Sequence, residues 1–443
     1  MIDEPIKTEN PGVPARRAAL DVLERIRKGE SIDDALILCR SYNDLEGADR
    51  AFSRALMSCV LRRQGSIDHI LGNYLDRPLA PKAARAMDIL RLSAAQTLFL
   101  KTPPHAAVST AVDLAAERKE IAGYAKLVNA VARKVVKHGT NALSKLPARV
   151  DTPAWLWRSW ERGFGPIFSK SIAEAHQQEA PLDLTIKDPA TAADWATRLE
   201  GTLLPTGSVR LNERKVPVTE LEGFGDGAWW VQDAAAALPI TLFGDLAGKS
   251  VYDVCAAPGG KTMQLAARGA DVTALDKSGD RLKRILENLE RTNLTAHTVK
   301  KDALEWKPAE KADGVLLDAP CSATGTIRRH PDIPWTKSQT DVDALITLQR
   351  QMIDHSLSFL KPGGMLVYCV CSLQREEGEA QAKDALKRNP GLSRIPLEEG
   401  EIDLKGALTR DGDLRTLPSM LSEKGGMDGF FAARFRWDGP NHG

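Results

Sequence analysis

The sequence predicts an α/β protein built from an all-α helical N-terminal domain followed by a doubly wound, mainly parallel α/β domain. Apolar residues recur at helical spacing through residues 15–140, whereas residues 244–438 alternate short apolar runs with amphipathic segments. That alternation is typical of a doubly wound sheet. A chain of 443 residues exceeds the usual size of one domain. We therefore expect three ranges: 1–145, 146–243 and 244–443.

The helical part is interrupted by short breaks and is strongly basic. Ala19, Val22 and Ile26 share one helical face, and breaks occur at Gly29, at 77–78 and at 103–104. Residues 51–150 hold sixteen Lys and Arg against six Asp and Glu, a balance of +10, while the whole chain carries +1. Such an excess suits a polyanionic partner, and the alternative is a solvated face.

Six strands are predicted in the α/β part. Each is a short apolar run bounded by turn or helix signals, at 250–255, 272–276, 297–300, 314–318, 365–369 and 430–435. Leu282, Ile285 and Leu289 mark one face of a helix between two of these runs. We expect a mainly parallel sheet whose last strand runs antiparallel.

Residues 146–243 have a different texture. Trp155, Trp157 and Trp160 lie among Arg158 and Arg162, and strand-like runs follow at 182–186 and 228–233. Aromatic side chains interleaved with arginine suit stacking on nucleotides. Anchoring of a domain junction explains the tryptophans equally well, so the range is interpreted as a linker or an aromatic-rich RNA-recognition subdomain.

The six cysteines lack the spacing of a zinc site or a disulfide framework. Cys39 and Cys59 lie in helical patterns and are expected to be buried thiols. No apolar run is long enough to cross a bilayer, and residues 1–14 have no apolar signal core. We expect a cytoplasmic monomer that uses no metal and no membrane.

A glycine-rich turn follows the first predicted strand. Residues 252–262 read YDVCAAPGGKT, which ends like a phosphate-binding loop, but that motif needs a glycine where Cys255 stands, and G-x-G-x-x-G is also absent. Asp276 ends the second strand, where a carboxylate can accept ribose hydroxyls, and Asp302 follows the third, within reach of an adenine edge. A ribose and adenine pocket without a pyrophosphate cradle favours S-adenosyl-L-methionine. Helix capping is the alternative for each aspartate.

Two further strand ends lead into cysteine loops. The strand at 314–318 runs into DAPCS at 318–322, and the strand at 365–369 runs into CVCSL at 369–373. Because the carboxyl ends of strands in an open α/β sheet converge on one crevice, Cys321 and Cys371 are expected to face the cofactor turn. Methylation of cytosine at C5 requires a thiol pair of this kind. In the alternative, both sulfurs are packed and inert.

The motifs at 253–261, 318–325 and 368–373 resemble the signature motifs of the RsmB/Nop2/Sun family of RNA cytosine-C5 methyltransferases, and 428–431 resembles its closing strand. The helical part, including 49–52 and 61–63, resembles the NusB RNA-binding domain found in the RsmB (Sun) branch. The resemblance implies a Rossmann-like, S-adenosylmethionine-dependent methyltransferase domain. Two departures are that Val370 replaces the usual threonine and that Cys369 adds a thiol, which could confuse labelling experiments.

These observations lead to a hypothesis for the mechanism. The thiolate of Cys371 attacks C6 of the base, Asp318 interacts with its N3 side, and, by family analogy, Cys321 assists release of the product. DNA enzymes of this chemistry use the Pro-Cys thiol instead, so the presence of both thiols favours RNA. Lys261 either steadies the loop or the base, or is a surface lysine. The expected cofactor contacts are Cys255, Ala256, Ala257, Pro258, Gly259, Gly260, Lys261, Asp276, Arg281, Asp302 and Asp318.

The expected substrate is RNA, with 16S ribosomal RNA implied by the N-terminal resemblance. Arg328, Arg329 and His330 are expected to line the RNA side and to hold phosphates. The target base must be single-stranded or flipped for its C5 and C6 to be reached. Alternatives are a transfer RNA or DNA cytosine-C5 methyltransferase, and a non-catalytic RNA-binding or antitermination-like factor suggested by the helical part alone.

Overall fold

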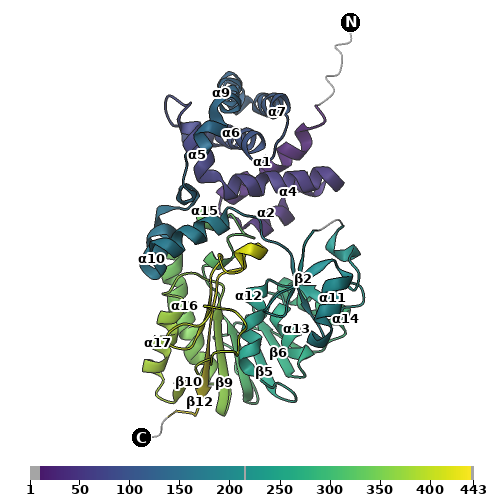
Figure 1. Cartoon of the computed structure of the whole chain (residues 1–443), viewed down its shortest axis with the longest axis vertical. Coiled ribbons are helices and arrows are strands. Elements are labelled where there is room, and N and C mark those ends of the chain that lie inside the picture. Colours follow the sequence, from purple (N-terminus) through teal and green to yellow (C-terminus); the bar gives the residue numbers. More distant parts are fainter. Residues whose placement is uncertain (1–9, 214–215, 441–443) are drawn as a thin grey trace. The chain divides into compact units, whose positions relative to one another are not determined.

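A computed structural model describes residues 10–213 and 216–440 (Figure 1). Contacts within the chain divide it into two compact units. The first comprises the described residues up to Glu161 together with His330–Ser338, and the second comprises Arg162–Arg329 with the residues from Gln339 onward. The ranges 1–145, 146–243 and 244–443 remain a proposal about parts that fold separately.

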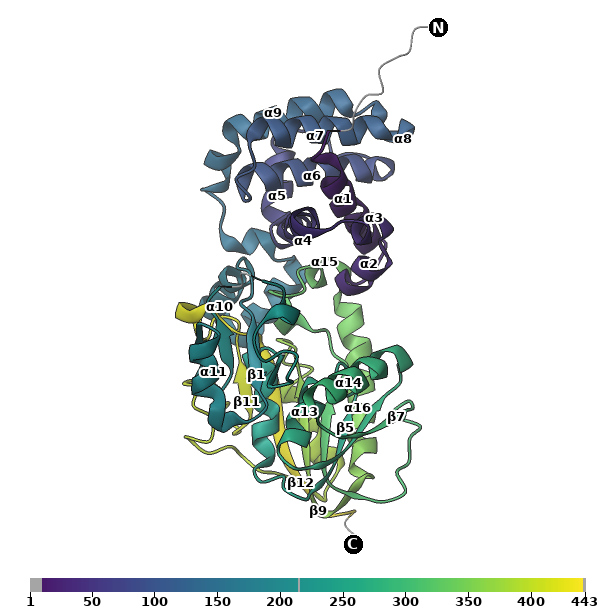
Figure 2. The same ribbon diagram turned by 90° about the vertical axis from the view of Figure 1, so that its right-hand side faces the viewer.

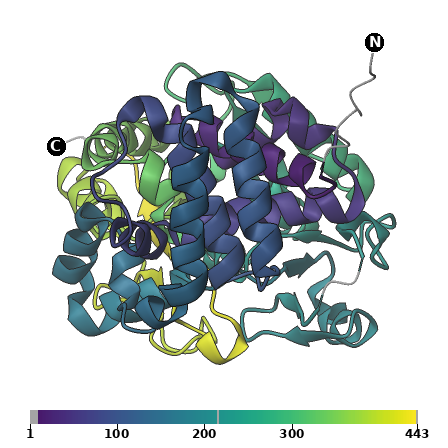
Figure 3. The same ribbon diagram turned by 90° about the horizontal axis from the view of Figure 1, so that it is seen from above.

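The first unit is helical, as the apolar spacing predicted. Leu20, Ile67, Ile89 and Val128 are fully buried in its core. Helices α6, α7 and α9 pack against one another and lie side by side in Figure 3. The helices are α1 (Val13–Arg27), α2 (Ile32–Leu38), α3 (Arg40–Asn43), α4 (Gly47–Arg62), α5 (Gln64–Gly72), α6 (Ala84–Leu98), α7 (Pro104–Glu117), α8 (Lys119–Ala122) and α9 (Ala125–Leu143), with α10 (Ala154–His176) continuing into the second unit.

A segment from late in the chain completes this helical unit. His330–Ser338, which contains the short helix α15 (Ile333–Thr336), belongs to the first unit although both flanking stretches belong to the second. The indole N–H of Trp335 donates to the Leu61 carbonyl at 2.8 Å, and the Asp332 carboxylate accepts from the Ile32 amide at 3.2 Å. Trp335 also packs against the helical core. Sequence periodicity gave no sign of this pairing.

Replacing Trp335 by alanine should destabilise the helical unit by about 2–4 kcal/mol, because the substitution removes a large apolar contact and an indole hydrogen bond. Hydrogen exchange should become faster in α1 and α4, which share that core. Lys337→Ala, at an exposed neighbouring position, is the control. Unchanged exchange in Trp335→Ala would contradict the assignment of this segment.

The second unit contains an eight-stranded sheet in the order β10-β12-β9-β8-β5-β6-β7, with β11 paired to β12 (Figures 1 and 2). β5, β6, β7, β8 and β9 pair in parallel, and β12 pairs antiparallel with β9, as predicted. The strands are β5 (Ser250–Val254), β6 (Asp271–Asp276), β7 (His297–Lys300), β8 (Ala312–Asp318), β9 (Leu360–Val370), β10 (Leu392–Arg394), β11 (Leu414–Thr416) and β12 (Phe430–Trp437).

Helices cover both faces of this sheet because its strands are apolar on both sides. Val367 and Cys369 of β9 face the core that contains Leu265 of α13 (Gly260–Ala267), whereas Leu366 and Tyr368 face the other core. α14 (Gly279–Thr292) lies with α13, and α16 (Gln339–Leu357) and α17 (Glu379–Arg388) cover the opposite face. Strands buried on both faces are a property of parallel sheets. The predicted strands match closely, whereas the three-residue strands β10 and β11 were missed.

The middle region forms a small antiparallel sheet in the order β2-β3-β1-β4, with α11 (Ala192–Arg198) packed against it. Its strands are β1 (Asp183–Ile186), β2 (Gly201–Leu203), β3 (Val209–Leu211) and β4 (Trp229–Val231). Trp157 and Trp160 are buried, so they cannot serve as open stacking platforms, and for these two the RNA-stacking interpretation is wrong. Arg149 lies over the Trp157 ring at 4.9 Å. Among the described residues, no helix combines the length and apolar character of a membrane span.

Candidate active site

The ends of three adjacent strands bring the predicted site loops together. β8 lies between β5 and β9, and Asp318 at the end of β8 is in register with Cys369 of β9. The glycine-rich turn follows β5, Cys321 follows β8, and Cys371 follows β9. Between β5 and β8 the strand order reverses, and this is the position where open α/β sheets form a ligand crevice.

Cys321 and Cys371 form a close thiol pair. Their sulfur atoms are 3.5 Å apart, and both residues are half-buried. The hydrogen bond between the two sulfurs, followed by burial, raises the pKa of Cys321 well above its ordinary value, and the carboxylate of Glu377 adds to the effect. Cys321 is therefore a protonated thiol at neutral pH, able to donate a hydrogen bond to the sulfur of Cys371.

Lys261 and Asp318 form a charged pair beside the thiols. The Lys261 ammonium lies 2.8 Å from Asp318 Oδ2 and 5.0 Å from the centre of the Phe430 ring. Burial lowers the pKa of Lys261, but the charge of Asp318, its hydrogen bond to the lysine and the sulfurs of Cys369 and Cys371 together outweigh burial and raise it, so the lysine stays charged. Lys261 is only 9 % exposed, which excludes its interpretation as a surface lysine. Its ammonium fixes the orientation of the Asp318 carboxylate.

Cys369 is enclosed within this cluster. Its side chain is fully buried, and its sulfur lies 3.6 Å from Asp318 Oδ1. Burial and the charge of Asp318 raise the pKa of Cys369 well above its ordinary value. Cys255, in the glycine-rich turn, has its pKa raised to about 12, first by burial and then by the same aspartate. Both side chains are therefore protonated packing groups, so the expected interference of Cys369 with labelling is not supported.

Alkylation with iodoacetamide should separate these thiols by pH. At pH 8 a thiol of pKa near 12 is about one part in ten thousand thiolate, so Cys255 should react very slowly and Cys369, which is also inaccessible, not at all. The Cys255 rate should rise about tenfold per pH unit above pH 8. Peptide mass spectrometry measures each site. Labelling of Cys369 at pH 8 as fast as that of Cys371 would contradict the prediction.

Hydrogen bonds with the next strand and the next helix fix the conformation of the glycine-rich turn. Gly259 and Cys255 have φ angles of +103° and +65°, in the left-handed region that turns the backbone sharply. The Ala257 amide donates to Asp276 Oδ2 at 3.2 Å, and a guanidinium N–H of Arg281 donates to the Ala257 carbonyl. Asp276 and Arg281 thus brace the turn from the end of β6 and from α14.

The residues around this turn fit S-adenosyl-L-methionine. Asp276 accepts hydrogen bonds from two backbone amides, those of Ala257 and Ser278, and a carboxylate has further lone pairs for ribose hydroxyls. Asp302 is exposed after β7 and accepts a hydrogen bond from the Leu304 amide. The N-cap of α14 is Ser278 and a turn follows Asp302, so neither aspartate is the helix cap that the alternative proposed. Asp253 Oδ1 is buried and has no hydrogen-bond partner among the described residues. Burial raises the pKa of Asp253 to about 7, although Thr262 donates to its other oxygen.

Glu377 connects the two cysteine loops and was missed by the sequence analysis. Its fully buried carboxylate accepts from the Ser322 amide and hydroxyl at 2.9 and 2.5 Å and from the Ser372 hydroxyl at 2.5 Å. Gln349 of α16 donates to the same carboxylate at 3.0 Å. Ser322 follows Cys321 and Ser372 follows Cys371, so one side chain fixes the spacing of both thiols. In the sequence Glu377 is indistinguishable from its neighbour Glu376, which is partly exposed and pairs with Arg162.

Glu377→Gln should lower kcat at least about tenfold, which corresponds to about 1.4 kcal/mol, because an amide cannot accept from all four donors. The affinity for S-adenosyl-L-methionine, measured by calorimetry, should stay unchanged. The matched control is Glu376→Gln, which alters only a partly exposed ion pair. Equal activity of the two variants would contradict a positioning role for Glu377.

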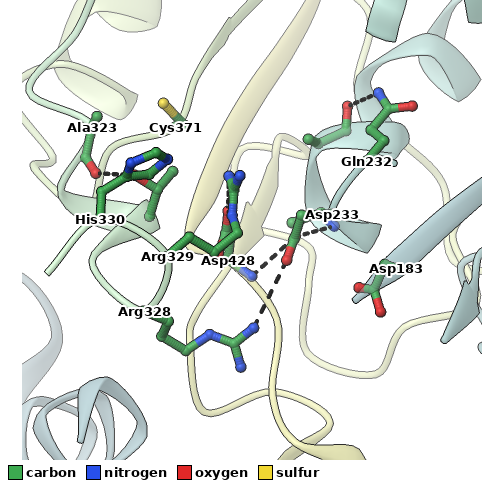
Figure 4. A network of polar contacts seen from close by, with 12 residues as sticks. Asp183, Gln232, Asp233, Ala323, Arg328, Arg329, His330, Cys371 and Asp428 are labelled. Carbon is green, nitrogen blue, oxygen red and sulfur yellow. Dashed lines mark hydrogen bonds and ion pairs between the residues drawn. The ribbon is translucent and has the colours of Figure 1, made fainter. Parts of the chain in front are cut away.

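A network of arginines and aspartates, in which Arg329 is the exposed member, lies next to these loops (Figure 4). Arg328 is 1 % exposed and donates to the Gly425 carbonyl, so its predicted place on the RNA side is wrong. Arg329 is partly exposed and pairs with Asp428. Burial lowers the pKa of Arg329, but the carboxylates of Asp428 and Asp233 outweigh burial and raise it, and a thiolate at Cys371 would raise it further. His330 belongs to the helical unit.

The structure thus brings together Cys321, Cys371, Asp318 and Lys261, and it gathers the glycine-rich turn with Asp276 and Arg281. The carboxylate of Asp302 accepts a hydrogen bond from the Leu304 amide of its own turn. In the described part of the chain, no group of three or more His, Cys, Asp or Glu side chains is arranged to hold a metal ion. The site therefore offers three groups: the half-buried thiol of Cys371, the protonated thiol of Cys321 and the carboxylate of Asp318, which Lys261 orients.

Comparison with known proteins adds independent findings. Residues 244–436 match the family described as 16S rRNA methyltransferase RsmB/F, and residues 13–137 match the NusB family. The chain is 34% identical over 391 residues to ribosomal RNA small subunit methyltransferase B of Vibrio cholerae, which covers 84% of this chain and 89% of the relative. The protein of the same name from Escherichia coli K12 is 33% identical over 389 residues, with coverages of 84% and 89%.

Solved structures share the fold. The crystal structure of PH0851 superposes with a TM-score of 0.76 over 97% of this chain and 99% of its own, at 22% identity. The structure of NSun6 from Pyrococcus horikoshii with SFG gives a TM-score of 0.54 over 65% of this chain and 98% of its own, at 19% identity. These likenesses support the Rossmann-like architecture of the second unit.

Proposed function

Because the chain belongs to the family of 16S rRNA methyltransferases RsmB/F, we propose that it methylates C5 of a cytosine in 16S ribosomal RNA through a covalent bond from Cys371 to the base. S-adenosyl-L-methionine is the cofactor and supplies the methyl group. The observation that carries the proposal is the pair of thiols 3.5 Å apart at the ends of adjacent parallel strands.

The chemistry explains why two thiols are needed. C5 of cytosine is a weak nucleophile, so the thiolate of Cys371 adds to C6 and the ring electrons move to C5, which can then take the methyl group. A base removes the C5 proton, the C5–C6 double bond re-forms, and the C6–S bond breaks with its electron pair returning to sulfur. A hydrogen bond from the protonated thiol of Cys321 would stabilise the departing thiolate, which is consistent with its raised pKa.

Asp318 and Lys261 are proposed to orient the base. When Cys371 adds to C6, negative charge develops on the ring, and N3 relieves it by taking a proton from water. Asp318, held by the Lys261 ammonium at 2.8 Å, would face the N3 side of the base and accept a hydrogen bond from the N3–H group that forms. A carboxylate that is already oriented costs no reorganisation during the reaction. The proposed cofactor contacts are the turn 255–261 with Asp276, Arg281, Asp302 and Asp318.

The roles of the two cysteines are tested by exchanging them separately. Cys371→Ser should abolish methyl transfer to an unmodified 16S ribosomal RNA transcript and should leave RNA binding intact. Cys321→Ser should accumulate a protein–RNA adduct, visible as a shifted band on a denaturing gel, because release from C6 is slowed. Cys59→Ala removes a buried thiol of the helical unit and should behave like the parent protein.

Three results would contradict the proposal. Full methylation by Cys371→Ser would remove Cys371 from the role of nucleophile. An adduct formed by Cys371→Ser through Cys321 would indicate the order of thiols found in DNA enzymes. The assignment of 16S ribosomal RNA as the substrate would be wrong if the methyl label from S-adenosyl-L-methionine appeared on transfer RNA or DNA and not on the 16S transcript.

A further inference from the structure

Helix α9 presents a continuous basic face to solvent. Its buried side is formed by Val128, Val131, Ala132, Val135 and Gly139, which pack in the helical unit. The opposite side exposes Lys126, Arg133, Lys134, Lys137 and His138. Residues 121–150 contain no aspartate or glutamate. No acidic residue within this stretch of the sequence therefore offsets the positive charge of the helix.

The spacing of these cations makes a stripe along the helix. Lys126, Arg133 and Lys137 are seven and four residues apart, so they lie near one line on the surface. At 1.5 Å per residue the stripe extends about 16 Å from Lys126 to Lys137. Such a length spans several phosphates of a nucleic-acid strand, and Lys134 lies directly beside it.

Four arginines elsewhere in the helical unit are engaged in ion pairs. Arg17 pairs with Glu117, Arg27 with Asp88, Arg85 with Asp21 and Glu24, and Arg91 with Asp68 and Asp88. On α9, Arg133 donates to Asn129, and across residues 10–213 and 216–440 no carboxylate forms an ion pair with Lys126, Lys134 or Lys137. The two arginines of α6 are thus neutralised by carboxylates, whereas over the same described ranges the lysines of α9 are not.

We propose that this α9 surface, defined by Lys126, Arg133, Lys134 and Lys137, binds the phosphate backbone of the substrate RNA. Point charges on flexible stems contact phosphates without reading bases, so the surface supplies affinity and leaves the choice of cytosine to the active site. The inference rests on the proposed function, because RNA is the polyanion that such an enzyme must hold. A purely solvated face would bind no RNA, and an acidic protein partner would leave RNA affinity unchanged on mutation.

The test uses the full chain with Lys126, Arg133, Lys134 and Lys137 all changed to alanine. Binding of an unmodified 16S ribosomal RNA transcript is measured from 50 to 300 mM KCl. The affinity should fall at least about tenfold near 150 mM, and the slope of log K against log salt should become shallower by about 0.7–0.9 for each phosphate that the protein no longer neutralises. The value of kcat at saturating RNA should remain within about twofold while KM for RNA rises.

A matched pair of double variants separates position from charge. Lys134→Ala with Lys137→Ala removes two exposed lysines of α9, and Lys383→Ala with Lys387→Ala removes two exposed lysines of α17. Only the α9 pair should reduce the salt slope. Alanine favours the helix, so circular dichroism and thermal unfolding should be unchanged.

Unchanged RNA affinity and salt slope in the four-residue variant would overturn the α9 proposal even if the parent protein methylates RNA. If RNA affinity is lost in the α9 variants while the parent protein shows no methyl transfer, the α9 surface stands and the proposed function fails. Equal weakening by the α17 pair would also overturn the proposal, because the effect would then reflect net charge alone.

Discussion

The parallel pairing of β8 with β9 is the constraint on which the site depends. Its register places Asp318 opposite Cys369, so the loops that follow the two strands must leave the sheet side by side. Glu377 then ties those loops together through hydrogen bonds to Ser322 and Ser372. Separating the two loops would leave the buried Glu377 side chain without these donors, which costs free energy. This cost keeps the loops together. Thiol spacing is therefore a property of the sheet and of one acid, and not of the cysteines themselves.

Charge in this region is handled in two ways. Lys261, which is buried, and Asp318, which is half-buried, form a pair in which each ion compensates the other. Asp253 and Asp428 are instead fully buried carboxylates whose pKa values are raised by burial to about 7 and about 6. Near neutral pH Lys261 stays charged, while Asp253 and Asp428 can hold a proton. The folded state binds these protons more tightly than the unfolded chain, so their contribution to stability is greatest at low pH and declines as pH rises toward 7.

The sequence was sufficient for the parts of the fold that repeat a pattern. Apolar runs located β5, β6, β8, β9 and β12 because strands buried on both faces are apolar through most of their length, and motif residues then marked the strand ends. The edge strand β7, whose end residues His297 and Lys300 are exposed, was placed by the alternation of strands and helices. The sequence pattern did not predict which charged residues are buried by contacts with residues far away in the sequence. Glu377 is buried because Ser322, Ser372 and Gln349 surround it, and Arg328 is internal because Gly425 and Asp233 face it, yet both residues look like ordinary surface charges. Strands β10 and β11 are held by β12 and have too few residues to show an alternation.

Completion of the helical unit by α15 affects the order of events during synthesis. Leu61 and Trp335, which share a hydrogen bond, are separated by 274 residues. N-terminal domains commonly fold while translation continues, but this unit would wait for the strand that carries Asp318 and for the loop that carries Cys321 to emerge before its last helix arrives. A nascent chain halted ahead of that point would expose the apolar surface that Trp335 later covers, which makes it a natural client for chaperones.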